Sequence, residues 1–186
     1  MTYRLFDAAR RYGSRNTFEH RDGKLDFVFT GDAWWSSVIE KPGQTPGFHL
    51  AEDAFEDMQA AANGMGAKLV VLLLPFKEQV YWPVVRQYYK DDPELGKLEE
   101  ADIDAPFVAL KSALDKRGIA ACDLTAPLRR ESETRGQLYL RAGAHWTEEG
   151  NAAAADSIAE CLRGLGVATI PGGAVAGALP AASGEH

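Results

Sequence analysis

The chain has 186 residues, of which 46% are hydrophobic and 25% charged, and its formal net charge is −7 at pH 7. Its length suits one α/β domain with a substantial core, and its acidity argues against nucleic acid or an anionic membrane as a partner, since both favour clustered Lys and Arg. No apolar run approaches the about 18 residues of a membrane span. The first residues do not resemble a secretory signal, which predicts a cytoplasmic chain if Met1 is the true start.

The first third of the chain shows helix and strand patterns in turn. Apolar residues at helical spacing predict a short helix over residues 3–12, and alternation predicts a strand over residues 25–29. Prolines and glycines over residues 42–47 predict a loop. The next apolar stripe predicts a helix over residues 50–62, closed by Asn63-Gly64.

An unbroken apolar run over residues 68–74, stopped by Pro75, is the strongest strand pattern in the chain. Such a run predicts a strand that is buried on both faces at the centre of a parallel sheet. Residues 76–89 are expected to be helical in part, with Pro83 as a break or kink. The acidic residues 91–104 are expected to form a solvated excursion.

The rest of the chain also alternates between helix and strand patterns. A helix is expected from Pro106 to a stop at Gly118, then a strand over residues 119–122 and a helix from Asp123 to about residue 134. Residues 138–140 read as a strand, and Thr147 as the cap of a helix that extends to Leu165, with Glu148 and Glu149 in its first turn.

This order of elements predicts an α/β domain over residues 1–170. Its sheet is expected to be doubly wound and mainly parallel, with helices on both faces. The Gly- and Ala-rich residues 171–186 show no periodic pattern and are expected to form a disordered tail.

The two cysteines, Cys122 and Cys161, each lie on an apolar pattern. We expect small buried side chains rather than nucleophiles. The sequence contains no Cys-x-x-Cys or His-x-x-x-His spacing, so it predicts neither a metal site nor a cofactor.

His145 is the strongest candidate for chemistry. It follows the strand pattern at residues 138–140 and precedes the helix capped by Thr147, which is where open α/β sheets place catalytic groups. A histidine there can act as a general base if a carboxylate orients its ring. Asp123, at another strand end, is a candidate for that carboxylate, as are Glu148 and Glu149, although Asp123 is also a good helix N-cap.

The block from Tyr139 to Gly150 resembles the Tyr-x-x-x-Asp-x-His-Trp-x-x-x-Gly block of SGNH (GDSL-like) hydrolases and alginate O-acetyltransferase-like proteins, with Gly143 at the aspartate place. Segments with the order of that family extend from about Phe55 to Leu162. The resemblance implies a flavodoxin-like three-layer fold, His145 as the base that activates a serine, and an extracytoplasmic location.

The serine of that family lies in a Gly-Asp-Ser block after the first strand. The comparable place here reads Gly31-Asp32-Ala33, which makes Asp32, Ala33 and the nearby Ser36 the candidates for the nucleophile position. On a second interpretation the serine block would precede Met1. The domain would then be truncated, with a missing N-terminal portion or a homo-oligomer as its complement.

Four residues are candidates for binding an acyl ester of a small molecule or a glycan: Lys77, Glu78, Tyr81 and Trp146. The first three follow the carboxyl end of the apolar strand, where they would line a cleft; alternatively the charged pair is solvated and Tyr81 packs. Together the patterns indicate an SGNH-like acyl-ester hydrolase or carbohydrate O-acetyltransferase with a divergent or partial active site. The alternative is an inactive SGNH-like module that binds a glycan or a partner chain.

Overall fold

The computed structural model of the chain describes residues 17–30, 43, 45–88 and 102–167. The expected helix at residues 3–12, the nucleophile candidates Asp32, Ala33 and Ser36, most of the acidic stretch and the tail from residue 171 lie outside the described residues. The elements, in chain order, are β1 Thr17–Arg21, β2 Asp26–Thr30, α3 Pro46–Gly64, β3 Val70–Leu73, α4 Lys77–Tyr88, α6 Ala105–Lys116, β4 Ala120–Asp123, α7 Thr125–Arg135 and α8 Glu148–Gly164.

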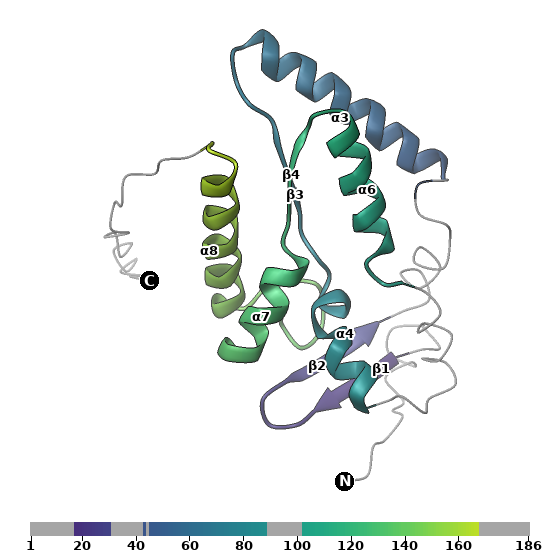
Figure 1. Cartoon of the computed structure of the whole chain (residues 1–186). Helices are drawn as coiled ribbons and strands as arrows, with labels where there is room; N and C mark the ends of the chain where they lie inside the picture. Colours follow the sequence, from purple (N-terminus) through teal and green to yellow (C-terminus); the bar gives the residue numbers. More distant parts are fainter. Residues whose placement is uncertain (1–16, 31–42, 44, 89–101, 168–186) are drawn as a thin grey trace, which may run out of the picture.

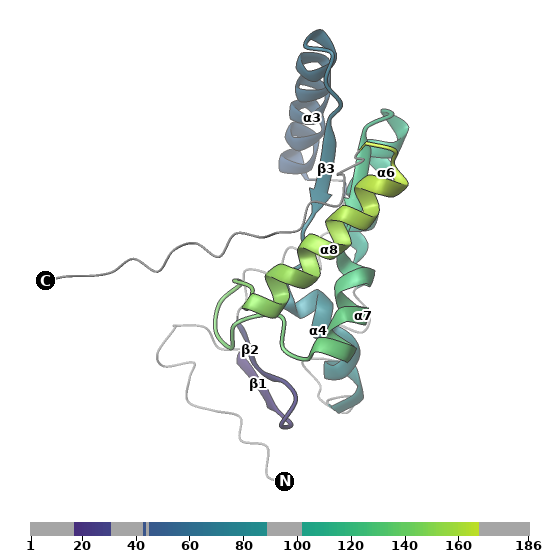
Figure 2. The same ribbon diagram turned by 90° about the vertical axis from the view of Figure 1, so that its left-hand side faces the viewer.

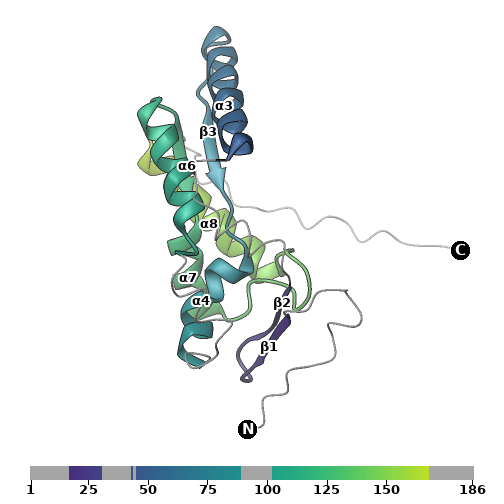
Figure 3. The same cartoon turned by 90° about the vertical axis from the view of Figure 1, so that its right-hand side faces the viewer.

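A parallel pair of strands, β3 and β4, forms the centre of the α/β layer, with Val70 aligned to Ala120 and Leu73 to Asp123. Helices α3 and α6 lie on one side of this pair and α8 on the other, as the three views agree (Figures 1, 2 and 3). The predicted α/β class is therefore confirmed. Within the described residues, the parallel sheet has only these two strands.

The prediction that the strand at residues 68–74 is buried on both faces is wrong for the described structure. Val71 and Leu73 are buried, but Leu72 is 36% exposed and Leu74 46% exposed. The reason is that side chains of α6 and α3 pack on the face of β3 that holds Val71 and Leu73, whereas α8 on the other side contacts β4. Leu72 is consequently exposed on the other face of β3, and Leu74 is exposed just beyond the end of the strand.

The predicted strand at residues 25–29 is found as β2, which pairs with β1 in an antiparallel hairpin (Figure 1). The hairpin is a second sheet, separate from β3 and β4. Phe27 and Phe29 of β2 are fully buried and stack on each other, and Phe27 also stacks on Tyr81 of α4. The hairpin thus adds an aromatic face to the core around α4.

Helix α3 begins earlier than predicted. The loop expected at residues 42–47 ends at Thr45, whose hydroxyl accepts a hydrogen bond from the backbone N–H of Phe48. Pro46 occupies the first turn, where its missing N–H costs nothing. Helix α4 extends from Lys77 to Tyr88 and continues through Pro83 without a break.

Two hydrophobic clusters lie on either side of the parallel strands. The smaller joins β3 and β4 to α6, with Val71, Leu73, Leu114, Ile119 and Ala121 as its buried members. The larger joins the hairpin, α4, α7, α8 and the segment at Leu138 and Tyr139. The segment that leads to His145 begins in this larger cluster. The start of that segment is therefore part of the core.

The two cysteines are paired, which was not predicted from the sequence. Both are tied into one disulfide, Cys122–Cys161, with a Cα–Cα distance of 6.1 Å. Cys122 is 1% exposed, so its expected burial is confirmed. The bond fastens α8 to the central strand β4.

Asp22 at the hairpin turn is expected to make the fold sensitive to acid. Partial burial raises the pKa of Asp22, but hydrogen bonds from the Leu25 backbone, the His20 side chain and the Lys24 backbone outweigh it and hold the pKa at about 2. A carboxylate with a depressed folded-state pKa stabilises the protein above its ordinary value of 3.8, and this contribution is lost as the pH falls through about 2.

Asp22→Asn should therefore lower the free energy of unfolding at pH 6 and flatten its decline between pH 4 and pH 2, as measured by urea denaturation. Asp53→Asn, an exposed position on α3, is the matched control and should leave both quantities unchanged. An Asp22→Asn protein with the acid profile of the wild type would contradict this role.

No helix in the described ranges is both long enough and apolar enough to cross a bilayer.

Candidate active site

Residues 138–147, here called the His145 loop, carry the candidate base. The strand predicted at residues 138–140 is not formed; the loop makes a single antiparallel bridge between Tyr139 and Trp146. Around it the Leu140 N–H donates to the His145 carbonyl at 2.8 Å, and the Thr147 N–H donates to the Leu138 carbonyl at 2.9 Å. A narrow loop that folds back on itself replaces the expected strand.

His145 lies on the rim of a cavity of about 370 Å³. The side chain is exposed, and in the described part of the chain no carboxylate contacts its imidazole. The other residues around the cavity follow the end of β3, flank His145 on its loop or lie at the start of α8: Leu74, Pro75, Phe76, Ala144, Trp146 and Asn151. Of the four predicted binding residues, only Trp146 is therefore brought to the candidate base.

Trp146 and Tyr139 attach the His145 loop to the residues that follow β3. The Tyr139 hydroxyl donates to the Pro75 carbonyl at 2.6 Å, and the Trp146 ring lies edge-on to Tyr139 with 6.4 Å between ring centres. Burial raises the pKa of Tyr139, against a hydrogen bond from Trp146. Tyr139 therefore remains a neutral hydrogen-bond donor that ties the loop to the end of β3.

The start of α8 is capped as predicted. The Thr147 hydroxyl accepts from the Gly150 N–H at 3.0 Å and donates to the Gln137 carbonyl at 2.9 Å. Gly150 lies so close to the loop that a Cβ there would overlap the Leu138 carbonyl oxygen. The cap and the glycine together set the direction in which the chain leaves His145.

Position 143, the aspartate place of the resembled block, has φ = +97°, a backbone conformation that disfavours side chains. An added Cβ would lie 3.9 Å from Cδ2 of His145. The backbone at this place is therefore built for glycine, although a side chain there would stand beside the imidazole.

Asp123 lies at the end of β4, as predicted, but its carboxylate accepts from the Thr125 N–H at 2.8 Å and lines a different hollow, against α6. Asp123 is not the N-cap that the sequence also suggested, because that place is held by Leu124, which makes no side-chain cap hydrogen bond. Glu148 and Glu149 are exposed in the first turn of α8. Among the described residues, none of the three predicted carboxylates makes a contact with His145.

Lys77, Glu78 and Tyr81 are buried rather than solvated or lining the cavity, with exposures of 2%, 7% and 0%. Burial lowers the pKa of Lys77, and Arg141 lowers it further, against the opposite effect of Glu78. Burial raises the pKa of Tyr81, against hydrogen bonds from the Leu138 and Tyr139 backbone. These side chains therefore lie on the core side of the His145 loop and not in the cavity wall.

No serine lines the cavity among the residues that the structure describes. Ser132 and Ser157 donate to backbone carbonyls within their own helices. In the same ranges, no group of three or more His, Cys, Asp or Glu residues could hold a metal ion. The site as described offers an exposed imidazole beside an apolar wall.

Five residues of the cavity were not predicted as site residues: Leu74, Pro75, Phe76, Ala144 and Asn151. The first three follow the carboxyl end of β3, which is the rule that drew attention to Lys77 and Glu78. Asn151 follows Gly150 directly and lies on the first turn of α8 that the Thr147 cap indicates. These signals were present in the sequence.

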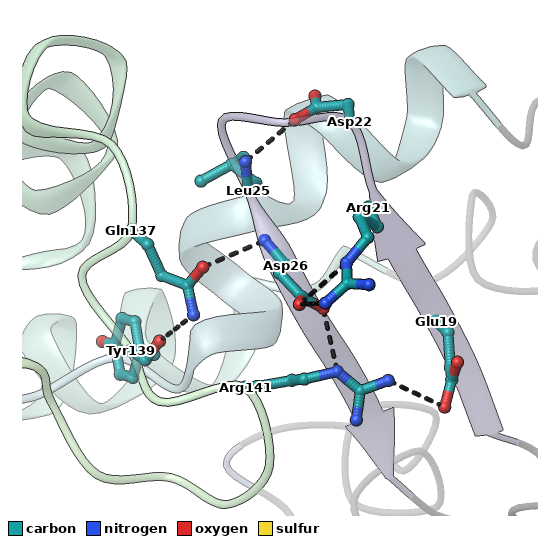
Figure 4. Close-up of polar contacts among 8 residues, drawn as sticks. All are labelled: Glu19, Arg21, Asp22, Leu25, Asp26, Gln137, Tyr139 and Arg141. Atoms are coloured by element: carbon teal, nitrogen blue, oxygen red, sulfur yellow. Dashed lines mark hydrogen bonds and ion pairs between the residues drawn. The ribbon is translucent and has the colours of Figure 1, made fainter.

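A polar network anchors the loop to the hairpin (Figure 4). The Arg141 guanidinium donates to Asp26 at 2.9 Å and pairs with Glu19 at 3.1 Å. Gln137 accepts from the Asp26 N–H and donates to the Tyr139 carbonyl, both at 3.0 Å. The chain from Gln137 to Arg141 is thus held by Asp26 of β2 and Glu19 of β1.

The described α/β domain, with its candidate histidine between the end of β3 and the capped helix α8, is compatible with the SGNH-like class that the sequence resembles. The model of one family, described as SGNH hydrolase-like domain, acetyltransferase AlgX, matches residues 22–183, and the chain belongs to this family.

Two curated relatives carry the name "Probable alginate O-acetylase AlgJ". The protein of Pseudomonas putida is 30% identical over 150 residues, covering 76% of this chain and 35% of the relative. That of Pseudomonas syringae pv. tomato is 29% identical over 142 residues, covering 75% and 32%. The chain thus spans about a third of the length of these relatives.

One solved structure, the O-acetyltransferase domain of Pseudomonas putida AlgJ, is 23% identical. It matches 77% of this chain and 46% of that chain with a TM-score of 0.48.

Proposed function

We propose that the chain is an acyl-transfer domain of carbohydrate O-acetyltransferase type, with His145 as its general base. His145 takes the proton of a serine hydroxyl, which attacks the carbonyl carbon of an acetyl ester, and returns the proton to the leaving alcohol. The acetyl group then passes from the serine to a carbohydrate hydroxyl, or to water in a hydrolase. The serine is not assigned, and Ser36 is the candidate nearest the expected place.

The single observation that carries this proposal is the placement of His145. Its exposed imidazole lies on the rim of a cavity beside Phe76 and Trp146, within the block that resembles the family's catalytic histidine. Family membership and the acetylase names of the relatives support a carbohydrate as the acceptor. The proposal needs neither a metal nor a cofactor.

The alternative is an inactive SGNH-like module that binds a glycan or a partner chain. Gly143 favours it, because the aspartate place holds a residue that cannot orient the imidazole, and loss of that carboxylate typically lowers catalysis by about 10⁴-fold. Trp146 and Phe76 at the cavity would then serve as an apolar contact for a sugar ring.

Two further features of the proposal concern the fold and the location. We infer that β3 and β4 belong to a wider, flavodoxin-like sheet, since among the described residues each pairs with only one neighbour and so leaves a backbone edge open. Leu72 on β3 and Leu74 just after it are exposed, and a further layer of this protein or a second copy of the chain would cover them. The Cys122–Cys161 disulfide supports an extracytoplasmic location, because disulfides persist in oxidising compartments.

The test is turnover of p-nitrophenyl acetate by the wild-type chain and by His145→Gln. The wild type is expected to release p-nitrophenol above the buffer rate, and His145→Gln to lower kcat/KM by about 10³-fold or more, because the base is lost. His49→Gln is the matched control, since His49 is an exposed histidine on α3, and it should keep wild-type activity. A wild type without turnover would favour the inactive module.

A further inference from the structure

The His145 loop has little internal bonding, so its position is set by residues outside it. Between the bridge partners Tyr139 and Trp146 the chain is exposed, and its tip turns at Gly143. A general base functions only if its nitrogen is held within a few tenths of an ångström of its working place. The groups that hold the loop are therefore as important as its own sequence.

Tyr81 of α4 holds the first residues of the loop. Its hydroxyl oxygen accepts from the Leu138 N–H at 2.9 Å and from the Tyr139 N–H at 3.2 Å, and its side chain is fully buried. One oxygen thus satisfies two successive backbone donors that no strand partner takes. Without the hydroxyl, both donors would be buried without a partner, and the loop would have to move.

Lys77, one helical turn earlier on α4, holds the middle of the loop. Its ammonium group donates to the Arg141 carbonyl at 3.1 Å, and the Val28 N–H donates to the same oxygen at 2.9 Å. Lys77 is 2% exposed, so this contact is shielded from water. Arg141 precedes His145 by four residues. Hydrogen bonds from α4 and β2 therefore hold the loop shortly before the candidate base.

We infer that Lys77 and Tyr81 are positioning residues for His145, which act through the backbone of the loop and do not touch the substrate. The inference rests on the proposed role of His145 as the base. This role of the Lys77 to Tyr81 segment differs from the cleft-lining role expected from its place after β3. The segment fixes the position of the histidine from within the core.

The experiment compares Tyr81→Phe with Tyr88→Phe, a matched loss of a hydroxyl on the same helix at a 45% exposed side chain. Two spectroscopic quantities are measured by NMR: hydrogen exchange of the Leu140 amide, which bonds to the His145 carbonyl, and the imidazole Cε1–H resonance of His145. Tyr81→Phe is expected to speed that exchange at least tenfold and to shift or broaden the resonance, whereas His49 stays unchanged. Tyr88→Phe should alter neither.

A second pair keeps the inference testable if Tyr81→Phe does not fold. Lys77→Met should have the same two effects, and Lys77→Arg should restore the wild-type resonance because it keeps a donor for the Arg141 carbonyl. Lys111→Met, at a partly exposed lysine of α6, should change neither quantity. A wild-type resonance and wild-type exchange in both Tyr81→Phe and Lys77→Met would overturn the inference.

Turnover separates this inference from the proposed function. If the wild type hydrolyses acetyl esters, Tyr81→Phe should lower kcat about tenfold or more with little change in KM. If it does not, a displaced His145 resonance still supports the positioning role while the proposed catalysis fails.

Discussion

Replacing both Cys122 and Cys161 by alanine is expected to lower the free energy of unfolding by about 2–5 kcal/mol, the range typical for loss of a native disulfide. The two residues are 39 apart in sequence, and closing a loop of that length removes chain entropy from the unfolded state worth about 4 kcal/mol in the chain-entropy model. For a chain of this size the melting temperature should fall by roughly 10 °C.

The structural reason for so large an effect is the place of the bond. It joins α8 to β4, so it links one of the helical layers to the central strands. Cys122 is buried in the larger core cluster, and alanine there leaves only a small void. The loss of stability should therefore come chiefly from the cross-link itself.

Urea denaturation checks this prediction in four samples: wild type and Cys122→Ala/Cys161→Ala, each with and without dithiothreitol. The reductant should lower the midpoint of the wild type to near that of the double variant and leave the double variant unchanged. Two free thiols in the untreated wild type, or a midpoint indifferent to reductant, would contradict the disulfide.

Gly150→Ala is the second substitution with a large expected effect. The new Cβ would overlap the Leu138 carbonyl oxygen, lie 2.8 Å from its carbonyl carbon and stand 3.0 Å from Cβ of Trp146. Since two of these atoms are backbone, α8 and the His145 loop must separate, and the free energy of unfolding should fall by roughly 3 kcal/mol, the upper part of the range for overpacking.

Gly164→Ala at the other end of α8 is the matched control. An added Cβ there meets nothing within 4 Å, so the same substitution should stabilise the protein by up to about 1 kcal/mol through helix propensity. Urea denaturation of both variants tests the pair. A Gly150→Ala protein as stable as Gly164→Ala would show that the loop and α8 are not in close contact.

Features decided by local chemistry could be predicted from the sequence. The Thr147 cap appears where expected, because its hydroxyl satisfies a free N–H of the first turn. Helix α6 begins at Ala105 with Pro106 in its first turn, where a missing N–H costs nothing, and Gly118 follows its end with φ = +68°. The strand β2 was predicted from its β-favouring residues and formed where expected. Phe27 and Phe29 share one buried face, and Val28 on the other face is buried as well.

Features decided by tertiary contacts could not be predicted. The apolar run that ends at Leu74 reads as fully buried, yet which face of a strand is covered depends on where helices far away in sequence are placed. Lys77 is charged and follows a strand, which favours a solvated or cleft position, but the Arg141 carbonyl 64 residues later satisfies its ammonium group inside the protein. The Cys122–Cys161 disulfide could not be predicted either, because the pairing depends on where α8 lies.

The candidate site divides in the same way. His145 and Trp146 were found from the spacing of one short block and lie together at the cavity. The carboxylate candidate Asp123 was chosen because it ends a strand, but its strand faces α6 at this point and its carboxylate caps the backbone at Thr125. Shared position at strand ends did not bring the two residues into contact.

The proposed function depends most on His145 acting as the base when an acetyl group is transferred to a serine. Intact-mass spectrometry of the chain after brief exposure to p-nitrophenyl acetate measures this step directly, with peptide mapping to locate the modified residue. We expect one acetyl group on a single serine in the wild type and none at that serine in His145→Gln. Equal acetylation of that serine in both proteins, or no acetylated serine in the wild type, would contradict it.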